Sequence, residues 1–245
     1  MRYSLRSLKQ YLPWVRKVWI LGDRPAFLTD DTRLVEHVPH EALAWIAGFK
    51  TPVTNGFLLM YLAALLPELE FEFLWFCDDY ILLEYLPQEL ARKDRCVQDL
   101  NKVTERGKGL WKESLWRTFD VLKRLGYPGF NYEIHVPIYL TKRRVLDAYR
   151  ALRDFTSEDR FFGLLAQSAV LNYAQKHEGM QPVILAEEGG NVGFHHMPAE
   201  SYEAIVEKCR GKTFLNFDDE ALDDNLRRYL AERFPTPSIY EKPGL

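Results

Sequence analysis

Residues 71–79 constrain the fold more strongly than any other stretch of the sequence. They form an apolar run rich in aromatic side chains, and the run ends in two adjacent carboxylates, Asp78 and Asp79. A run of this length and composition predicts a buried strand. The two carboxylates need partners if they are buried, because an unpaired charge in a protein core is costly. The alternative is a strand that simply ends in an acidic turn.

Helices and strands alternate along the first half of the sequence. Apolar periodicity predicts an amphipathic helix at 2–11, short strands at 17–21 and 34–38, and an apolar helix at 52–66 before the strand at 71–79. This alternation predicts an α/β fold of Rossmann-like type, with a mainly parallel sheet and helices on both faces. A helix followed by a strand at this spacing is half of a βαβ unit, so a further strand is expected before residue 1.

The second half of the sequence is predicted to be mainly helical. Short extended segments are expected at 132–139, 182–186 and 213–217, and residues 80–85 fit either a strand or a short helix. The predicted helices are 88–103, 110–125, 142–152, 158–174, 198–209 and 220–233. No linker-like stretch divides the chain, so residues 1–245 are expected to form a single domain. The tail at 234–238 is expected to be irregular and to pack across the body.

Composition excludes several classes of protein. Cys77, Cys96 and Cys209 are widely spaced and form no CxxC motif, which argues against a disulfide framework and a structural zinc site. A reducing compartment is the simplest setting, and we expect a cytoplasmic protein. The net charge of -3 does not indicate a polyanion-binding protein, although a local basic patch remains compatible with it. No apolar stretch is long enough to span a bilayer.

Four polar clusters follow or interrupt apolar runs, at 22–25, 78–79, 133–137 and 216–219. In an open α/β sheet, ligands bind at the carboxyl ends of the strands, so several clusters are expected to converge on one edge. The carboxylates of Asp78 and Asp79 are the hard oxygen ligands that suit Mg²⁺ or Mn²⁺ shared with a substrate diphosphate. Each cluster also has an ordinary structural explanation, as a turn, a hydrogen-bonded histidine or a helix cap.

Several of these residues are candidates for catalysis or substrate binding. His135 or a carboxylate such as Asp219 is the candidate for handling an acceptor proton. The candidates for binding substrate offer carboxylates in turns, cations for phosphate, an amide or a stacking ring. They are Asp23, Arg24, Lys50, Asn55, Lys108, Trp111, Arg117 and Asp218. The basic loop at 106–109 and the following helix offer cations and aromatic surfaces for nucleic acid. The alternative is a solvated loop and a core-facing helix stripe.

The adjacent histidines His195 and His196 look like a metal-binding pair. Neighbours in sequence seldom point at one ion, so we interpret them as part of an exposed loop.

Four blocks of the sequence resemble the Stealth family of sugar-phosphate transferases. Residues 2–8 and 15–25 are similar to the second block of the family, and 76–79 to its aromatic strand that ends in Asn-Asp-Asp. His135-Val136-Pro137 is similar to its His-Pro block, and 214–219 to its late Phe-x-x-Leu-Asn-Asp. The blocks occur in family order, although Cys77 and Asp218 stand where the family has Asn. The first family block, which carries the first strand, has no counterpart in these residues.

The same blocks, the short length and the Phe-Pro-x-Pro-Ser tail at 234–238 resemble more closely the GT-A-type phage and bacterial glycosyltransferases. That group includes the TET-associated glycosyltransferases. This resemblance implies a GT-A-like fold, a nucleotide-sugar donor such as a UDP-sugar, and Mn²⁺ or Mg²⁺ held by Asp79 with Asp78. It implies hydroxymethylpyrimidines in phage DNA as the acceptor, with a cell-surface glycan as the alternative.

Two other functions stay open. One is a Stealth-like transferase that moves a hexose 1-phosphate onto a cell-surface polysaccharide. The other is a non-catalytic binding module that kept the fold.

Overall fold

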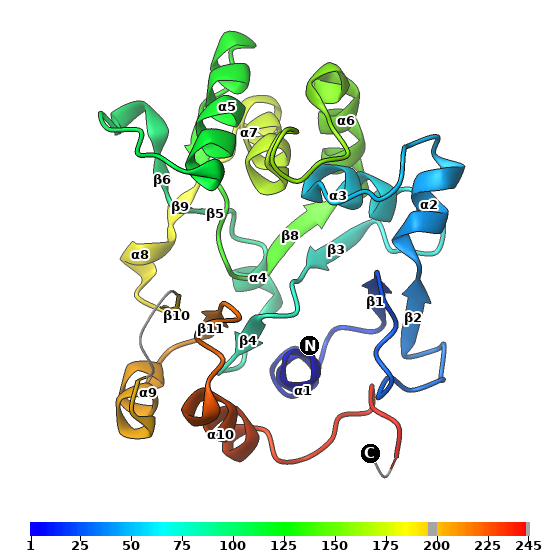
Figure 1. Cartoon of the computed structure of the whole chain (residues 1–245), viewed down its shortest axis with the longest axis vertical. Coiled ribbons are helices and arrows are strands. Elements are labelled where there is room, and N and C mark those ends of the chain that lie inside the picture. The colour runs from blue at the N-terminus through cyan, green and yellow to red at the C-terminus, as the bar shows by residue number, and fades with distance from the viewer. Residues whose placement is uncertain (196–199, 244–245) are drawn as a thin grey trace.

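The structure is a computed structural model that describes residues 1–195 and 200–243. The chain has a mixed α/β fold: short strands run through the middle of the molecule and helices lie on both sides (Figure 1). The helices on one side are α3 (Gly56–Ala64), α5 (Leu110–Arg124), α6 (Lys142–Leu152) and α7 (Ala166–Glu178). Those on the other side are α1 (Arg2–Tyr11), α9 (Tyr202–Cys209) and α10 (Asp224–Arg233).

The predicted mainly parallel sheet is not formed by the described residues. The parallel pairs are β1 (Val18–Leu21) with β2 (Val35–Val38), β5 (Arg95–Cys96) with β9 (Val183–Ile184), and β10 (Asn191–Phe194) with β11 (Phe214–Phe217). The antiparallel pairs are β3 (Glu72–Trp75) with β8 (Ile138–Thr141), β4 (Tyr80–Leu82) with β11, and β6 (Gln98–Asp99) with β7 (Phe130–Asn131). Parallel and antiparallel pairing are therefore equally represented.

Short connections explain part of this difference. Only residues 76–79 link β3 to β4. A parallel pair needs a crossover of about a dozen residues or more, so two strands joined this closely cannot lie parallel and adjacent. Instead, β3 pairs with β8 and β4 pairs with β11. The predicted strand does form within 71–79, and residues 80–85 contain a strand rather than a helix.

Several predicted helices are confirmed, and others are wrong. The helices predicted at 2–11, 110–125 and 142–152 form within a residue of their expected bounds. Residues 88–103 are not one helix, because β5 and β6 pair there with distant strands between the short helices α4 (Gln88–Ala91) and η1 (Leu100–Lys102).

The helix predicted at 158–174 begins only at Ala166, where α7 starts. Residues before it are held by the loop ahead of α3, whose Thr54 and Asn55 amides donate to the Glu158 carbonyl at 2.8 and 3.0 Å. A short η2 helix (Arg153–Phe155) follows α6.

Two short helices and one strand were not expected from the sequence. They are α2 (His40–Ile46), α8 (Leu185–Glu188) and β10 (Asn191–Phe194). The start of the helix predicted from Pro198 lies outside the described residues, and its described part is α9. None of the described helices is long and apolar enough to cross a membrane.

The C-terminal segment that packs across the body lies at 240–242, just after the predicted tail at 234–238, of which residues 235–237 are exposed. The Thr29 amide donates to the Tyr240 carbonyl at 2.9 Å, and the Lys242 amide donates to the Phe27 carbonyl at 2.8 Å. The buried carboxylate of Glu241 accepts hydrogen bonds from Nε and Nη2 of Arg6, at 2.8 Å each. The tail is therefore fixed against α1, which in turn packs on β4, where the Leu82 amide donates a hydrogen bond to the Ser7 hydroxyl.

Candidate functional site

The turn between β3 and β4 carries Asp78 and Asp79. The side chain of Asp78 is 67% exposed and that of Asp79 is 30% exposed. Cys77 lies beside them as a free thiol, and burial raises its pKa to about 12, so it is no nucleophile at neutral pH. The Tyr80 hydroxyl donates to the Ile134 carbonyl at 3.0 Å. This hydrogen bond ties the acidic turn to the segment that carries His135.

The N-terminus of α7 holds the segment at 133–135 in place. Gln167 accepts a hydrogen bond from the Ile134 amide at 2.9 Å, and Glu133 accepts one from the Ser168 amide at 2.8 Å. The Glu133 carboxylate thus takes the place of a side-chain cap on this helix, which has none at its N-cap residue. Loss of solvent around the carboxyl raises the pKa of Glu133 despite these hydrogen bonds. Between these anchors, the His135 side chain remains 52% exposed.

The ends of β10 and β11 supply the other half of the site. His195 follows β10 directly, and its Nε2 lies 2.5 Å from the Oδ1 of the buried Asn216 on β11. Asp218 follows β11, and its Oδ1 accepts a hydrogen bond from the Ala221 amide at 2.9 Å. The parallel pairing of these two strands therefore brings His195 and Asp218 to the same end.

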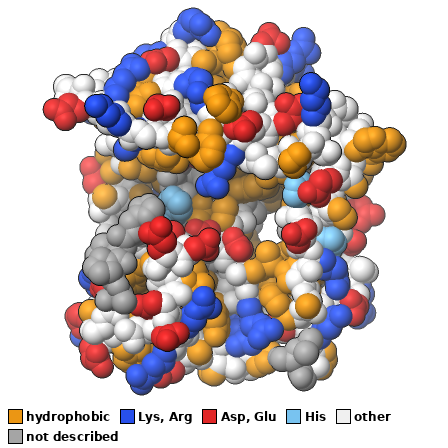
Figure 2. All heavy atoms as spheres, viewed as in Figure 1, with side chains coloured by type: hydrophobic (Ala, Val, Ile, Leu, Met, Phe, Trp, Pro, Cys, Tyr) orange, Lys and Arg blue, Asp and Glu red, His pale blue; other side chains and the backbone are white. Residues whose placement is uncertain are grey.

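These segments meet in one place. The His135 and His195 rings lie 5.2 Å apart between centroids. The Nδ1 of His135 is 3.8 Å from Asp79 Oδ2, and the Nδ1 of His195 is 3.8 Å from Asp218 Oδ2. We call Asp78, Asp79, His135, His195, Asn216 and Asp218 the carboxylate–histidine cluster. Figure 2 shows Asp and Glu side chains with a histidine around a hollow in the middle of this face.

Three of the four polar clusters expected to converge thus do so. The fourth, at 22–25, forms the turn after β1, where Arg24 pairs with Asp30 at 2.6 Å and Asp23 is exposed.

The cluster contains carboxylates of the kind that a divalent cation shares with its substrate, and the cation itself stays a prediction. Among the described residues, no group of three or more His, Cys, Asp or Glu side chains forms a complete metal cage. Mg²⁺ is usually held by one or two carboxylates plus substrate phosphates, and it keeps several waters. The half-exposed carboxylates of Asp78 and Asp79 match this pattern in number, chemistry and access to solvent.

Other predicted binding residues lie in different environments. Asn55 is buried and caps α3, because its Oδ1 accepts the Phe57 and Leu58 amides at 3.0 and 3.3 Å. Lys50 is exposed in the loop before α3. Asp219 is exposed next to Asp218, at the rim of the cluster. The role of each in substrate binding or catalysis stays a prediction.

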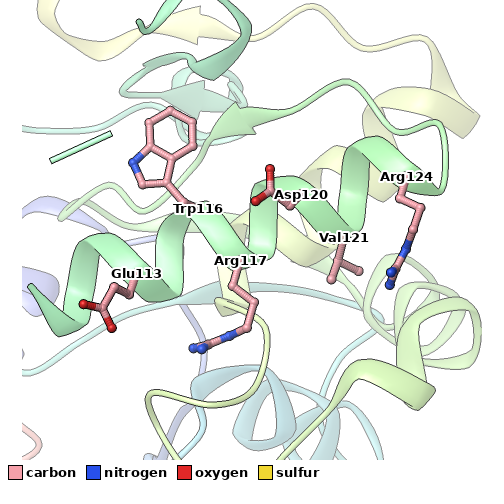
Figure 3. A pocket seen from close by; sticks show the side chains of 6 residues that line it. All are labelled: Glu113, Trp116, Arg117, Asp120, Val121 and Arg124. Carbon is pink, nitrogen blue, oxygen red and sulfur yellow. The ribbon is translucent and has the colours of Figure 1, made fainter. Parts of the chain in front are cut away.

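Lys108, Trp111 and Arg117 lie on α5 and the loop before it. Arg117 lines a groove of about 530 Å³ along α5, shared with Glu113, Trp116, Asp120, Val121 and Arg124 (Figure 3). The Arg117 guanidinium stacks over Phe162 at 5.7 Å, while its Nε is buried without a partner among the described residues. Of the three residues, Arg117 lines this groove, whereas Lys108 and Trp111 do not. The role of each in substrate binding stays a prediction.

Sequence reasoning did not select His195 as a site residue, and it noted Glu133 and Asn216 only as members of the polar clusters at 133–137 and 216–219 without giving either a role. His195 was interpreted as a loop residue because its neighbour is also a histidine; His196 lies outside the described residues. The available signal was the position of His195 directly after a short apolar run, as for Asp78 and Asp218. Asn216 lies inside a buried strand, where a polar side chain needs a specific partner.

Comparison with known proteins gives one relevant similarity. No protein-family model matches the chain. The chain is 29% identical over 91 residues to the capsular polysaccharide phosphotransferase LcbA of Aeromonas hydrophila. The matched part covers 36% of this chain and 24% of that protein, so it spans about a quarter of the relative's length. This distant similarity points to a transferase.

Proposed function

We propose that this protein transfers a sugar phosphate from a nucleotide-diphosphate sugar to a hydroxyl group of a polysaccharide. The observation that supports this proposal most directly is the similarity to a capsular polysaccharide phosphotransferase. This similarity favours the Stealth-like hypothesis, in which a sugar phosphate is transferred, over the glycosyltransferase hypothesis, in which the sugar alone is transferred. The carboxylate–histidine cluster supplies the kinds of group that phosphoryl transfer needs: carboxylates for a cation and a base for the acceptor.

In this reaction the acceptor oxygen attacks the phosphorus that carries the sugar. A new P–O bond forms to the acceptor, the P–O bond to the nucleotide monophosphate breaks, and a base receives the acceptor proton. Asp78 and Asp79 would hold Mg²⁺ or Mn²⁺, which neutralises phosphate charge and stabilises the leaving nucleotide. The neighbouring groups are His135, 3.8 Å from Asp79, and His195, 3.8 Å from Asp218, and either histidine is a candidate base for the acceptor hydroxyl.

The nucleotide released distinguishes the two transferase hypotheses. Transfer of a sugar phosphate from a UDP-sugar releases UMP, whereas transfer of the sugar alone breaks the C1–O bond and releases UDP. We would incubate the protein with Mn²⁺, a panel of UDP-, GDP- and CDP-hexoses and capsular oligosaccharides, and separate the released nucleotides by chromatography. We expect the monophosphate and a phosphodiester in the product. Release of the diphosphate, onto glycans or hydroxymethylated DNA, would instead support the glycosyltransferase hypothesis.

The proposal also predicts a specific effect of Asp79. We expect Asp79→Asn to weaken the Mn²⁺-dependent binding of UDP by at least about tenfold, since even outer-shell partners of metal ligands contribute this much. Isothermal titration calorimetry with and without Mn²⁺ measures the effect. Asp154→Asn is the matched control, because Asp154 is 86% exposed on the surface beside Arg153. Equal affinity in wild type and Asp79→Asn would show that the acidic turn holds no cation.

A further inference from the structure

The structure contains two histidines in the cluster, and only one base is needed. We infer that His195, oriented by Asn216, is the base that accepts the proton of the acceptor hydroxyl. The inference rests on the proposed function, because it assigns a role within that reaction.

The amide of Asn216 has a defined orientation. Its Nδ2 donates to Asn191 Oδ1 at 2.9 Å and to the Val192 carbonyl at 3.4 Å. The Val192 carbonyl can only accept a hydrogen bond, so this end of the Asn216 amide must be the nitrogen. The opposite end, Oδ1, therefore faces His195 Nε2 at 2.5 Å. Asn216 is 1% exposed, so its amide is shielded from bulk solvent.

This orientation fixes the tautomer of His195. An amide oxygen only accepts hydrogen bonds, so the Nε2 that faces it carries the hydrogen. In the neutral ring, the remaining lone pair then lies on Nδ1. A base oriented by a third group in this way is the arrangement that recurs in enzymes with an activated hydroxyl.

The Nδ1 of His195 faces the interior of the cluster. Asp218 Oδ2 lies 3.8 Å away, too far for a direct hydrogen bond. The ring is 36% exposed, so an acceptor hydroxyl can reach this nitrogen. Among the described residues, the groups that face the ring are Asp218 after β11 and His135 from the segment before β8, with Asp79 beyond His135. Once His195 holds the proton, the carboxylate of Asp218 stabilises the imidazolium.

Gly193 makes this arrangement possible. A Cβ at this position would lie 3.0 Å from Asn216 Oδ1 and 3.0 Å from His195 Nε2. These distances are shorter than ordinary contacts, so any side chain would push the ring and the amide apart. The close approach of the His195 ring to the Asn216 amide therefore depends on the glycine at position 193.

His135 lacks a comparable support. Its side chain is 52% exposed, and no hydrogen bond from the described part of the chain fixes its ring. Its Nδ1 lies 3.8 Å from Asp79, which we assign to the cation. We therefore place His135 beside the donor phosphates and His195 beside the acceptor.

The first test is spectroscopic and needs no substrate. Nitrogen-15 NMR of histidine-labelled protein reports the tautomer of each ring, and His195→Gln identifies the His195 signals by their loss. We expect the Nε2–H tautomer at neutral pH, and loss of this preference in Asn216→Ala. A neutral His195 with its hydrogen on Nδ1 would overturn the inference.

The second test follows nucleotide monophosphate release. Gln keeps a nitrogen donor near the position of Nε2 but provides no base, so we expect His195→Gln to lower kcat by about 100-fold or more with little change in KM. Asn216→Ala should lower kcat by about 10–100-fold through misorientation of the ring. Asn216→Asp should restore part of the rate and shift the acid limb of the kcat profile to higher pH, because the new carboxylate favours the imidazolium. His177→Gln, in the exposed last turn of α7, is the control.

The two proposals fail in different ways. A wild-type protein that releases no monophosphate from any donor would refute the proposed function. A wild-type protein that is active, together with His195→Gln within threefold of its kcat, would refute only the role of His195. A large loss in His135→Gln but not in His195→Gln would move the base to His135.

Discussion

The buried ion pair between Arg6 and Glu241 gives the sharpest prediction about stability. The Glu241 carboxylate is 1% exposed and accepts both Arg6 bonds at 2.8 Å as well as the Ser238 amide at 2.7 Å. The Arg6 side chain is 11% exposed and also donates to the Phe234 carbonyl at 2.8 Å. Glu241→Gln therefore leaves a buried guanidinium without its counter-charge.

We expect Glu241→Gln to lower the free energy of unfolding by about 3 kcal/mol, the low end of the cost of breaking a buried pair. For a chain of this size, that corresponds to a fall in Tm of about 6–12 °C. Urea denaturation followed by tryptophan fluorescence measures the loss. The control is Glu207→Gln, whose ion pair with Arg210 is 66–72% exposed and should contribute less than about 1 kcal/mol.

The same pair predicts a dependence on pH. Burial alone would raise the pKa of Glu241, but its hydrogen bonds with Arg6 and Ser238 outweigh this effect and the pKa is lowered. A carboxylate with a lowered folded pKa stabilises the fold above its unfolded pKa of about 4.3, and this stabilisation is lost as pH falls through the folded pKa. The difference between wild type and Glu241→Gln should therefore be constant near neutral pH and shrink in acid. Equal stability of Glu241→Gln and Glu207→Gln at pH 7 would refute the reasoning.

Two further substitutions test how the helices of the fold are capped and packed. Asn55→Ala removes the cap of α3 and the hydrogen bonds that Nδ2 donates to the Asp159 and Leu164 carbonyls. It should lower the free energy of unfolding, measured by urea denaturation, by about 2–3 kcal/mol. A loss below about 0.5 kcal/mol would contradict this structural role. Gly129→Ala should lower Tm in a calorimetric scan by an amount equivalent to about 1–3 kcal/mol, because φ is 103° and the new Cβ would lie 2.7 Å from Phe119. An unchanged Tm would show that Phe119 and the backbone relax without cost.

The local sequence determined much of this protein. Apolar periodicity placed α1, α5 and α6 within a residue of their observed bounds, because each helix buries one face and exposes the other. The run at 71–79 and its two carboxylates were recognisable for the same reason. The sequence also indicated that several of the four polar clusters would lie together, but not which of them.

The tertiary structure alone decided how the strands pair and which histidine belongs to the site. Short strands carry no record of their partner, so the antiparallel pairing of β3 with β8 and of β4 with β11 could not be seen in the local pattern. The same holds for His195, which acquires its place only because β10 lies parallel to β11 and sets the ring against Asn216. Periodicity reports which face of a segment is buried, whereas the chemistry of this cluster depends on contacts between segments far apart in the chain.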